Sequence, residues 1–205
     1  MRPRCGRPPV SILRCFRWPV VVLVLLWCGA AHSETQVYLL RGWFGVFSTG
    51  MDTMAEELRG KGINAEAIMH MFWRSAASKI IKERAAGHAA KIVLVGHSQG
   101  ANNAIEFARE LQAHNIPVDL LITLVPFMQD PVPPNVLRAI NYYQSPGWGS
   151  ALIADPAFKG ILSNVDIAGD WGTLHITIDK SSKVQAAVID AIMALSKQDI
   201  AQGSH

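Results

Sequence analysis

The sequence predicts an α/β fold in which about six mostly parallel strands form one sheet and helices cover both faces, as a three-layer sandwich. Short apolar runs, often β-branched, alternate along the chain with segments whose apolar residues recur at helical spacing. One of these runs leads directly into a glycine-flanked turn and then a helical pattern. This alternation is typical of βαβ units, whose right-handed crossovers place the carboxyl ends of the strands at one edge. A functional site is therefore expected at that edge.

The first half of the chain is expected to supply three strands and two helices. Val37–Leu40 is a short apolar run and predicts the first strand. Met51–Lys61 has apolar residues at helical spacing and ends at glycines, so it predicts an amphipathic helix. Ile63–Met69 alternates apolar and polar residues, which suits a strand near the sheet edge, and Ser75–Ala89 predicts a second helix. Ile92–Val95 is unbroken and apolar, as expected of a central strand.

The second half continues the alternation. Gln99–His114 predicts a helix, and Asp119–Val125 predicts another buried strand. Val136–Tyr143 is expected to be a strand, with a helix as the alternative. The segment after it is rich in glycine and proline and predicts irregular structure up to a short last strand, Asn164–Ala168. Lys183–Lys197 then predicts a closing amphipathic helix.

The first 31 residues are expected to be a signal peptide rather than part of the fold. Met1–Arg17 holds five Arg and no acid, and Val20–Trp27 is an unbroken apolar run. Small residues follow, so we expect cleavage after Ala30 or Ala31. The apolar run is short for a permanent membrane anchor. The alternative is a lipoprotein signal centred on Cys28, although Trp27 stands where such signals have a small residue; no Arg-Arg pair supports twin-arginine export.

This leader accounts for the apparent basic charge of the chain. All 16 acids lie beyond residue 31, whereas five of the 19 Lys and Arg lie before it, which leaves residues 32–205 with 14 basic residues and a net charge of −2. Binding to nucleic acid therefore loses its support. All three cysteines also lie in the leader, so residues 32–205, expected to be a single domain, have no disulfide, thiolate metal site or Cys nucleophile. We expect a periplasmic or secreted protein.

The segment Gly96-His97-Ser98-Gln99-Gly100 carries the chemistry. A strand, a sharp turn with a central Ser between two glycines, and a helix form the setting of a nucleophile elbow. The tight turn brings strand and helix so close that a Cβ at Gly96 or Gly100 would clash. The elbow would present Ser98 Oγ in front of a helix N-terminus, whose N–H groups suit a developing oxyanion.

On these residues, the chain resembles the α/β-hydrolase superfamily, in particular its small lipases, esterases and thioesterases. The resemblance extends from about Gln36 to Ser196 and is strongest at the elbow. It implies a minimal α/β-hydrolase fold, without the family's two leading strands and without a large cap domain.

The resemblance also implies a general base and an acid. A Ser hydroxyl needs a base to accept its proton, and the family's chain order places that histidine after the last strand, where His175 lies. The family's usual position for the acid, after the strand near Val136, offers no carboxylate. Some lipases of the family place the acid one strand earlier, which selects Asp130. The other candidates for the acid are Asp155, Asp166 and Asp170. Asp179 is instead expected to cap the final helix together with Ser181.

For the oxyanion hole, the resemblance implies the backbone N–H of Gln99 and one from the loop after the first strand, with Trp43 selected and Phe44 as its alternative. Arg41 stands in this loop where the family usually has His. It would bind a substrate phosphate or carboxylate, or form an ion pair with an acid of the chain.

Large apolar residues near the expected site predict a cleft for an acyl or aryl group. They share positions in loops or at element ends: Trp43, Phe44, Phe47, Phe72, Trp73, Phe127, Met128, Trp148 and Trp171. The sequence has no metal-ligand cluster and no phosphate- or dinucleotide-binding glycine pattern, so no metal and no cofactor is expected.

Together these features predict an exported serine hydrolase of carboxylic esters, including lipid esters, with peripheral contact to a membrane as a further expectation. A thioesterase or acyltransferase would use the same residues. The alternative from another class is a catalytically silent protein of the hydrolase fold that binds a ligand in the cell envelope.

Overall fold

The computed structural model describes residues 34–43, 48–168 and 177–202. The chain divides into Met1–Ala30 and Ala31–His205, and every described residue lies in the second unit. Its strands are β1 (Thr35–Arg41), β2 (Asn64–Met69), β3 (Lys91–His97), β4 (Leu120–Leu124), β5 (Arg138–Tyr143) and β6 (Ile161–Asp166). Its α-helices are α1 (Gly50–Gly60), α2 (Trp73–Ala85), α3 (Gln99–Ala113) and α4 (Ser182–Gln202), with short 3-10 helices η1 (His70–Phe72) and η2 (Ile178–Lys180).

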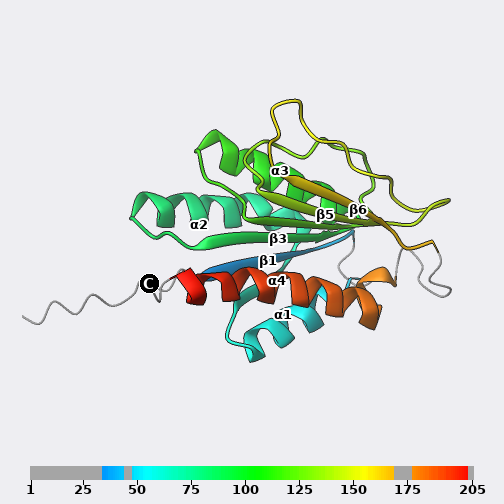
Figure 1. Ribbon diagram of the computed structural model, residues 1–205, viewed down its shortest axis with the longest axis horizontal. Helices are drawn as coiled ribbons and strands as arrows, with labels where there is room; N and C mark the ends of the chain where they lie inside the picture. Colours follow the sequence, from blue (N-terminus) through cyan, green and yellow to red (C-terminus); the bar gives the residue numbers. More distant parts are fainter. Residues whose placement is uncertain (1–33, 44–47, 169–176, 203–205) are drawn as a thin grey trace, which may run out of the picture. The chain divides into compact units, whose positions relative to one another are not determined.

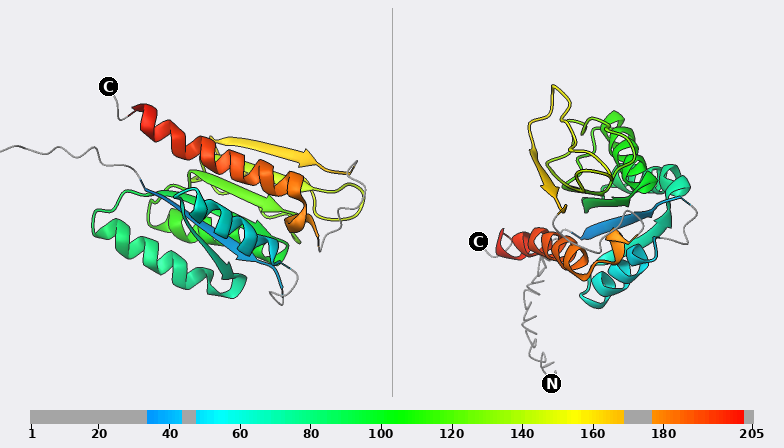
Figure 2. Two further views of the ribbon diagram at one scale, coloured as in Figure 1. Left: turned by 90° about the horizontal axis from the view of Figure 1, so that it is seen from below. Right: turned by 90° about the vertical axis from the view of Figure 1, so that its right-hand side faces the viewer.

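The six strands form one parallel sheet in the order β2-β1-β3-β4-β5-β6. Helices cover both faces: α1 and α4 lie on one side and α2 and α3 on the other (Figures 1 and 2). Side chains of β3 alternate between the two cores, because Val93 and Val95 pack with α1 and α4 while Leu94 packs with α2 and α3. The predicted fold class is confirmed.

Several predicted boundaries change in the structure. Val136–Tyr143 is a strand, as predicted, and the helix alternative is wrong because Arg138–Tyr143 pairs with β4 and β6. Helix α2 begins at Trp73 and ends at Ala85, before Gly87, whose φ of +90° is incompatible with a continuing helix. The last strand begins at Ile161 rather than Asn164, since pairing with β5 starts there.

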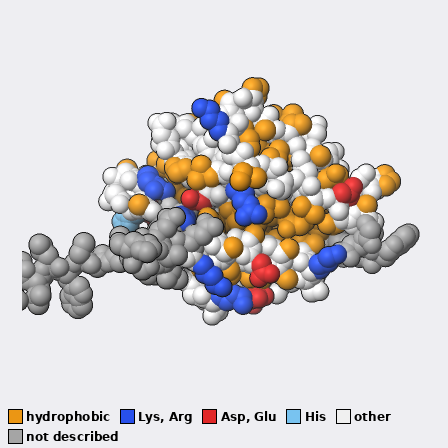
Figure 3. All heavy atoms as spheres, in the orientation of Figure 1, with side chains coloured by type: hydrophobic (Ala, Val, Ile, Leu, Met, Phe, Trp, Pro, Cys, Tyr) orange, Lys and Arg blue, Asp and Glu red, His pale blue; other side chains and the backbone are white. Residues whose placement is uncertain are grey.

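The outer strand β6 is incompletely covered. Figure 3 shows the molecule in the orientation of Figure 1, in which β6 lies toward the viewer. Hydrophobic side chains gather across the middle of this face. Exposed apolar residues of this region include Leu137, Ile161 and Val165. The segment between β5 and β6 contains no helix, so α4 alone approaches this part of its face. Among the described helices, none is both long enough and apolar enough to cross a bilayer.

Candidate functional site

Ser98 lies at a sharp turn between the end of β3 and the start of α3. Its φ of 55° and ψ of −122° are rare for a residue with a side chain. The Ser98 N–H donates to the Leu124 carbonyl at the end of β4 (2.9 Å), which anchors the turn to the neighbouring strand. A strained backbone at a central Ser between strand and helix is the conformation of a nucleophile elbow.

The two glycines of the elbow are required by close backbone contacts. A Cβ on Gly96 would lie 2.3 Å from the Gly100 carbonyl oxygen, and a Cβ on Gly100 would lie 2.3 Å from the carbonyl oxygen of Leu40. No Cβ approaches a backbone atom so closely. The elbow therefore packs β3, α3 and β1 against one another, as the motif predicts.

The loop after β1 lies directly beside the nucleophile. A Cβ on Gly42 would lie 3.0 Å from the His97 carbonyl oxygen and 3.2 Å from Ser98 Cβ. Trp43 follows it and is 67% exposed. Gln99 is the first residue of α3, so its N–H belongs to the first turn, where no intrahelical acceptor exists. These positions fit the predicted oxyanion donors, whose role stays a prediction.

Arg41, the residue that departs from the family pattern, forms an ion pair with Asp52 on α1. Of its two expected roles, the structure shows pairing with an acid of the chain. Phe44, the alternative oxyanion donor, lies outside the described residues.

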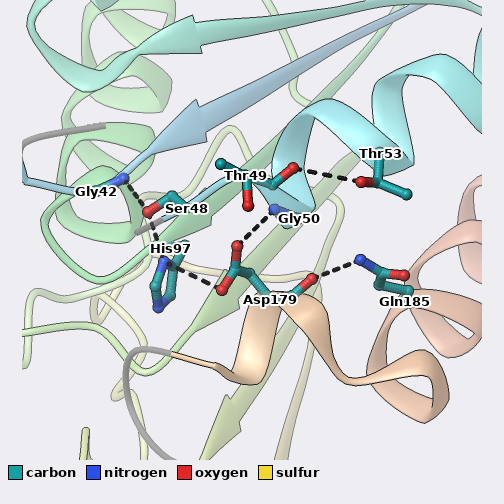
Figure 4. A network of polar contacts seen from close by, with 8 residues as sticks. All are labelled: Gly42, Ser48, Thr49, Gly50, Thr53, His97, Asp179 and Gln185. Carbon is teal, nitrogen blue, oxygen red and sulfur yellow. Dashed lines mark hydrogen bonds and ion pairs between the residues drawn. The ribbon is translucent and has the colours of Figure 1, made fainter. Parts of the chain in front are cut away.

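A buried polar network lies beneath the loop and the elbow (Figure 4). The Gly42 N–H donates to Ser48 Oγ (2.9 Å), and Ser48 Oγ also hydrogen-bonds His97 Nδ1 (2.8 Å). Asp179 Oδ1 lies 4.0 Å from the same His97 nitrogen, and Asp179 Oδ2 accepts a hydrogen bond from the Gly50 N–H (2.8 Å). Ser48, His97 and Asp179 are all buried.

Asp179 has a different role from the one predicted. It was expected to cap the final helix, but its carboxylate accepts from the Gly50 N–H at the start of α1, and only its backbone carbonyl reaches α4, through Gln185 Nε2 (2.7 Å). The prediction was wrong because a tertiary contact supplies the N-terminal acceptor of α1, where Thr49 makes no side-chain cap. Burial raises the pKa of the Asp179 carboxyl to about 6, although the Gly50 N–H and the Lys180 charge lower it.

Asp130, the selected acid, is held by α3. Asn102 Nδ2 donates to Asp130 Oδ2 (2.6 Å) and to the Met128 carbonyl (2.9 Å), while Asn102 Oδ1 accepts from the N–H groups of Phe127 and Met128. This clamp holds the loop after β4 against the first turn of α3. The predicted partner, His175, lies outside the described residues, so the pairing of Asp130 with His175 stays a prediction.

The alternative acids have local roles where the structure describes them. Asp155 Oδ1 accepts from the Ala157 N–H (2.8 Å), and Asp166 Oδ1 accepts from the N–H groups of Ser145 and Ala168. The contacts with Ala157 and Ala168 are turn contacts two residues along the chain, whereas the contact with Ser145 joins Asp166 to the loop after β5. Asp170, like His175, lies outside the described residues.

Of the residues predicted to line an apolar cleft, five are exposed and two border the same hollow. Phe72, Phe127, Met128 and Trp148, like Trp43, are between 48% and 70% exposed. Phe127 and Trp148 line a hollow of about 280 Å³ with Pro126, Gly147, Gly149 and Ser150. The prediction for Trp73 was wrong, because Trp73 begins α2 and is buried against Phe107 in the core. Phe44, Phe47 and Trp171 lie outside the described residues.

Sequence reasoning missed the residues that hold the site together. Asn102, Ser48 and the tertiary role of Asp179 carry no motif. Asn102 and Asp179 act on backbone groups distant in the sequence, and Ser48 acts on Gly42 across a loop with no regular structure to predict the contact. The one available signal was Asn102, a polar residue one turn after the nucleophile, at a position that faces the core. Within the described ranges, no cluster of His, Cys, Asp and Glu could hold a metal ion.

No protein-family model and no curated protein matches this chain. Solved structures do match its fold. RedJ, a thioesterase from the prodiginine pathway of Streptomyces coelicolor, is 12% identical over 78% of this chain and 94% of its own, with a TM-score of 0.53. Lipase B of Aspergillus fumigatus is 12% identical over 80% of this chain and 53% of its own, with a TM-score of 0.54. Human thioesterase 2 is 10% identical over 81% of this chain and 98% of its own, with a TM-score of 0.52. The chain has the α/β-hydrolase fold.

Proposed function

We propose that this protein is an exported serine hydrolase that cleaves carboxylic esters, including lipid esters, through an acyl-enzyme on Ser98. The observation that carries the proposal is the backbone of Ser98 itself, held at φ 55° by a turn whose glycines admit no side chain. Strain of this kind persists where the surrounding structure requires it and is concentrated at functional sites. The lipase and thioesterases of the same fold support the class of reaction.

The reaction would proceed in two halves. Ser98 Oγ attacks the acyl carbonyl while His175 accepts its proton, and the backbone N–H groups of Gln99 and Trp43 stabilise the oxyanion. Collapse of the tetrahedral intermediate breaks the bond to the alcohol, which takes the proton from His175. Water then attacks the acyl-enzyme while His175 accepts its proton. The second intermediate collapses, Ser98 takes the proton back from His175, and the carboxylic acid is released. Asp130 would orient the His175 ring and stabilise its protonated form.

The proposal favours oxygen esters over thioesters. The predicted signal peptide would deliver the protein outside the cytoplasm, where acyl-CoA is not an available substrate. An alcohol in place of water would give acyl transfer with the same residues, so product analysis with and without added alcohol separates the two outcomes.

The test is hydrolysis of p-nitrophenyl esters of increasing acyl length by protein beginning at Ala31. Wild type is compared with Ser98→Ala, His175→Ala and Asp130→Asn, and with Ser78→Ala as a matched control, since Ser78 lies on an exposed part of α2. We expect a loss of at least about 10³-fold in kcat for the first two variants, because each removes a member of the reacting pair. A fluorophosphonate probe should label wild type and the Ser78 variant but not Ser98→Ala.

Retained activity in Asp130→Asn with loss in the other two would move the role of the acid to Asp155 or Asp170. Absence of both turnover and labelling in wild type would reject the enzyme. A ligand-binding protein built on the hydrolase fold would then remain.

A further inference from the structure

Buried side chains connect the loop after β1 with the turn of Ser98. Gly42 belongs to the loop after β1 and lies against the Ser98 turn. Its N–H donates to Ser48 Oγ, and Ser48 is 1% exposed. The hydroxyl therefore fixes the backbone of the loop from which the second oxyanion donor is expected.

His97 secures Ser48 in turn. It is the last residue of β3, and strand alternation places its side chain on the same face as Val95, toward α1. Its Nδ1 hydrogen-bonds Ser48 Oγ at 2.8 Å. The residue next to the nucleophile along the chain is thus bonded to the side chain that holds the oxyanion loop.

Asp179, from the C-terminal part of the chain, is the third residue of this network. It is fully buried, accepts from the Gly50 N–H and is held through its carbonyl by Gln185 of α4. Its second carboxylate oxygen lies 4.0 Å from His97 Nδ1 and has no hydrogen-bond partner within the described residues. The carboxylate therefore faces the ring on the side where Ser48 binds it (Figure 4).

These three residues do not form a second catalytic triad. A Ser-His-Asp triad uses the two ring nitrogens for different partners, whereas Ser48 and Asp179 both face His97 Nδ1. Ser48 is also buried and already accepts the Gly42 N–H. Within the described residues, the side chains of Ser48 and Asp179 contact backbone N–H groups and His97, which is the arrangement of a supporting shell.

We propose that Ser48, His97 and Asp179 are positioning residues. They hold the start of the loop after β1, at Gly42 (the Gly42 loop), against the Ser98 turn, so that the oxyanion donors are in place before substrate binds. The inference rests on the proposed hydrolase function. Its physical basis is preorganisation: donors that are fixed in advance need no rearrangement as charge develops in the transition state. Loosening the loop should therefore slow the chemical step more than it weakens substrate binding.

The test compares Ser48→Ala, His97→Ala and His97→Asn with the Ser78→Ala control. An Asn side chain places an amide near the position of the His Nδ1, so it can replace the bond to Ser48. On the best p-nitrophenyl ester we expect kcat to fall roughly 10- to 100-fold in Ser48→Ala and His97→Ala, with KM changed less than about threefold. His97→Asn should recover most of the loss, and Ser78→Ala should match wild type.

A second measurement does not depend on turnover. Amide hydrogen exchange, followed by mass spectrometry on the peptide that contains Gly42, should be at least about tenfold faster in Ser48→Ala than in wild type, because the acceptor of the Gly42 N–H is gone. The α2 peptides of the same variant serve as the internal control and should be unchanged, which separates local loosening from unfolding.

The outcomes are distinguishable. Unchanged kcat in a folded Ser48→Ala, a loss that appears only in KM, or unchanged exchange at Gly42 would overturn the positioning role. If wild type neither turns over an ester nor reacts with the fluorophosphonate, the proposed function fails instead. Faster Gly42 exchange in Ser48→Ala would then still support the structural half of the inference, that Ser48 holds this loop.

Discussion

At the scale of single residues, the candidate site keeps two groups in states that cost free energy. Ser98 has a positive φ, which costs about 1–3 kcal/mol for a residue with a side chain. Asp179 places a carboxyl group among buried residues, where the charged form is disfavoured. Both lie within the same network of strand ends and loop contacts. Packing elsewhere in the chain must therefore offset the free-energy cost of these two residues.

Asp179 makes the stability of the protein dependent on pH. Its pKa is raised from 3.8 to about 6 in the folded state, so the favourable contribution of the neutral carboxyl is complete below about pH 4 and is lost as the pH rises through 6. Asp179→Asn retains an acceptor for Gly50 but cannot ionise. We expect its free energy of unfolding, relative to wild type, to increase by up to about 3 kcal/mol between pH 4 and pH 7.

Urea unfolding of both proteins at pH 4, 5, 6 and 7 measures this difference. Among the described residues, the titratable groups near Asp179 include His97, Lys180 and Asp52, so the same series with Asp52→Asn is the control for the other carboxylate that raises the pKa of Asp179. A difference between wild type and Asp179→Asn that stays constant over this range would show that Asp179 does not titrate there.

Phe127 and Trp148 should determine which acyl chains are hydrolysed well. Both line one hollow, and the backbone of Phe127 is bonded to Asn102 in the first turn of α3, which follows Ser98. Truncating either to Ala removes apolar contact, which we expect to lower kcat/KM about tenfold for an octanoyl ester and less than about threefold for an acetyl ester. Kinetics on the p-nitrophenyl series measure the effect. Equal losses for short and long chains would argue against acyl binding in this hollow, and Leu137→Ala, at an exposed apolar position before β5, is the control.

At the scale of elements, the local sequence pattern correctly predicted the elbow, which depends on a single turn. The elbow joins a strand, a turn and a helix that are adjacent in the sequence, so its residues specify their own geometry. Trp73 was misassigned for the opposite reason. Its position at the start of a helix does not reveal that Phe107 of α3 packs against it. Contacts between elements far apart in the chain are not encoded in local periodicity.

The same limit explains why the surroundings of Asp130, the selected acid, could not be predicted. Chain order selected Asp130, and the structure shows that its carboxylate is bonded to Asn102 of the helix after the nucleophile. No spacing in the sequence indicates this contact, since 28 residues separate the two. Asp179 shows the same effect more strongly, because it accepts from Gly50 across 129 residues.

The close packing of the elbow glycines predicts that adding one methyl group there lowers both stability and activity. In Gly100→Ala the new Cβ would lie 2.3 Å from the Leu40 carbonyl oxygen and 2.7 Å from that of Arg41, so backbone rather than a flexible side chain would have to move. We expect a loss of at least about 2 kcal/mol in the free energy of unfolding, measured in urea, together with loss of esterase activity.

Gly60→Ala is the matched control for this substitution. Gly60 ends α1, and a Cβ there meets no atom within 4 Å. The same chemical change should stabilise the protein by roughly 0.5–1 kcal/mol, because alanine loses less backbone freedom than glycine in a helix. Equal effects of the two substitutions would contradict the close packing of the elbow.

At the scale of the whole molecule, the parallel topology is what assembles the site. The elbow follows β3, the Gly42 loop follows β1 and the Asn102-held loop follows β4, and these three strands are neighbours in the sheet. Their carboxyl ends therefore meet at one edge, as the alternation of strands and helices predicted. This is why the sequence could predict that the elbow and its neighbouring loops lie at one edge of the sheet, while most of the hydrogen bonds between them could not be predicted.

Composition adds a prediction about the first 31 residues, which hold all three cysteines and five of the 19 basic residues. If this segment is a signal peptide, the full chain made in a bacterial host should be recovered outside the cytoplasm as a protein beginning at Ala31 or His32. Its net charge should be −2, its sequence should contain no cysteine, and its unfolding transition should be the same with and without a thiol reductant.

Intact-mass analysis of the exported fraction tests this directly. Leu25→Arg, which interrupts the apolar run, should prevent export and leave the full-length chain in the cytoplasm, because a charge in that run opposes insertion. Thr53→Arg, which adds the same charge on the surface of α1, is the control and should be exported normally. A mass that includes a lipid on Cys28 would instead show a lipoprotein. A full-length exported chain would show that the leader is retained, and it would place the candidate site on a protein held at the membrane rather than released from it.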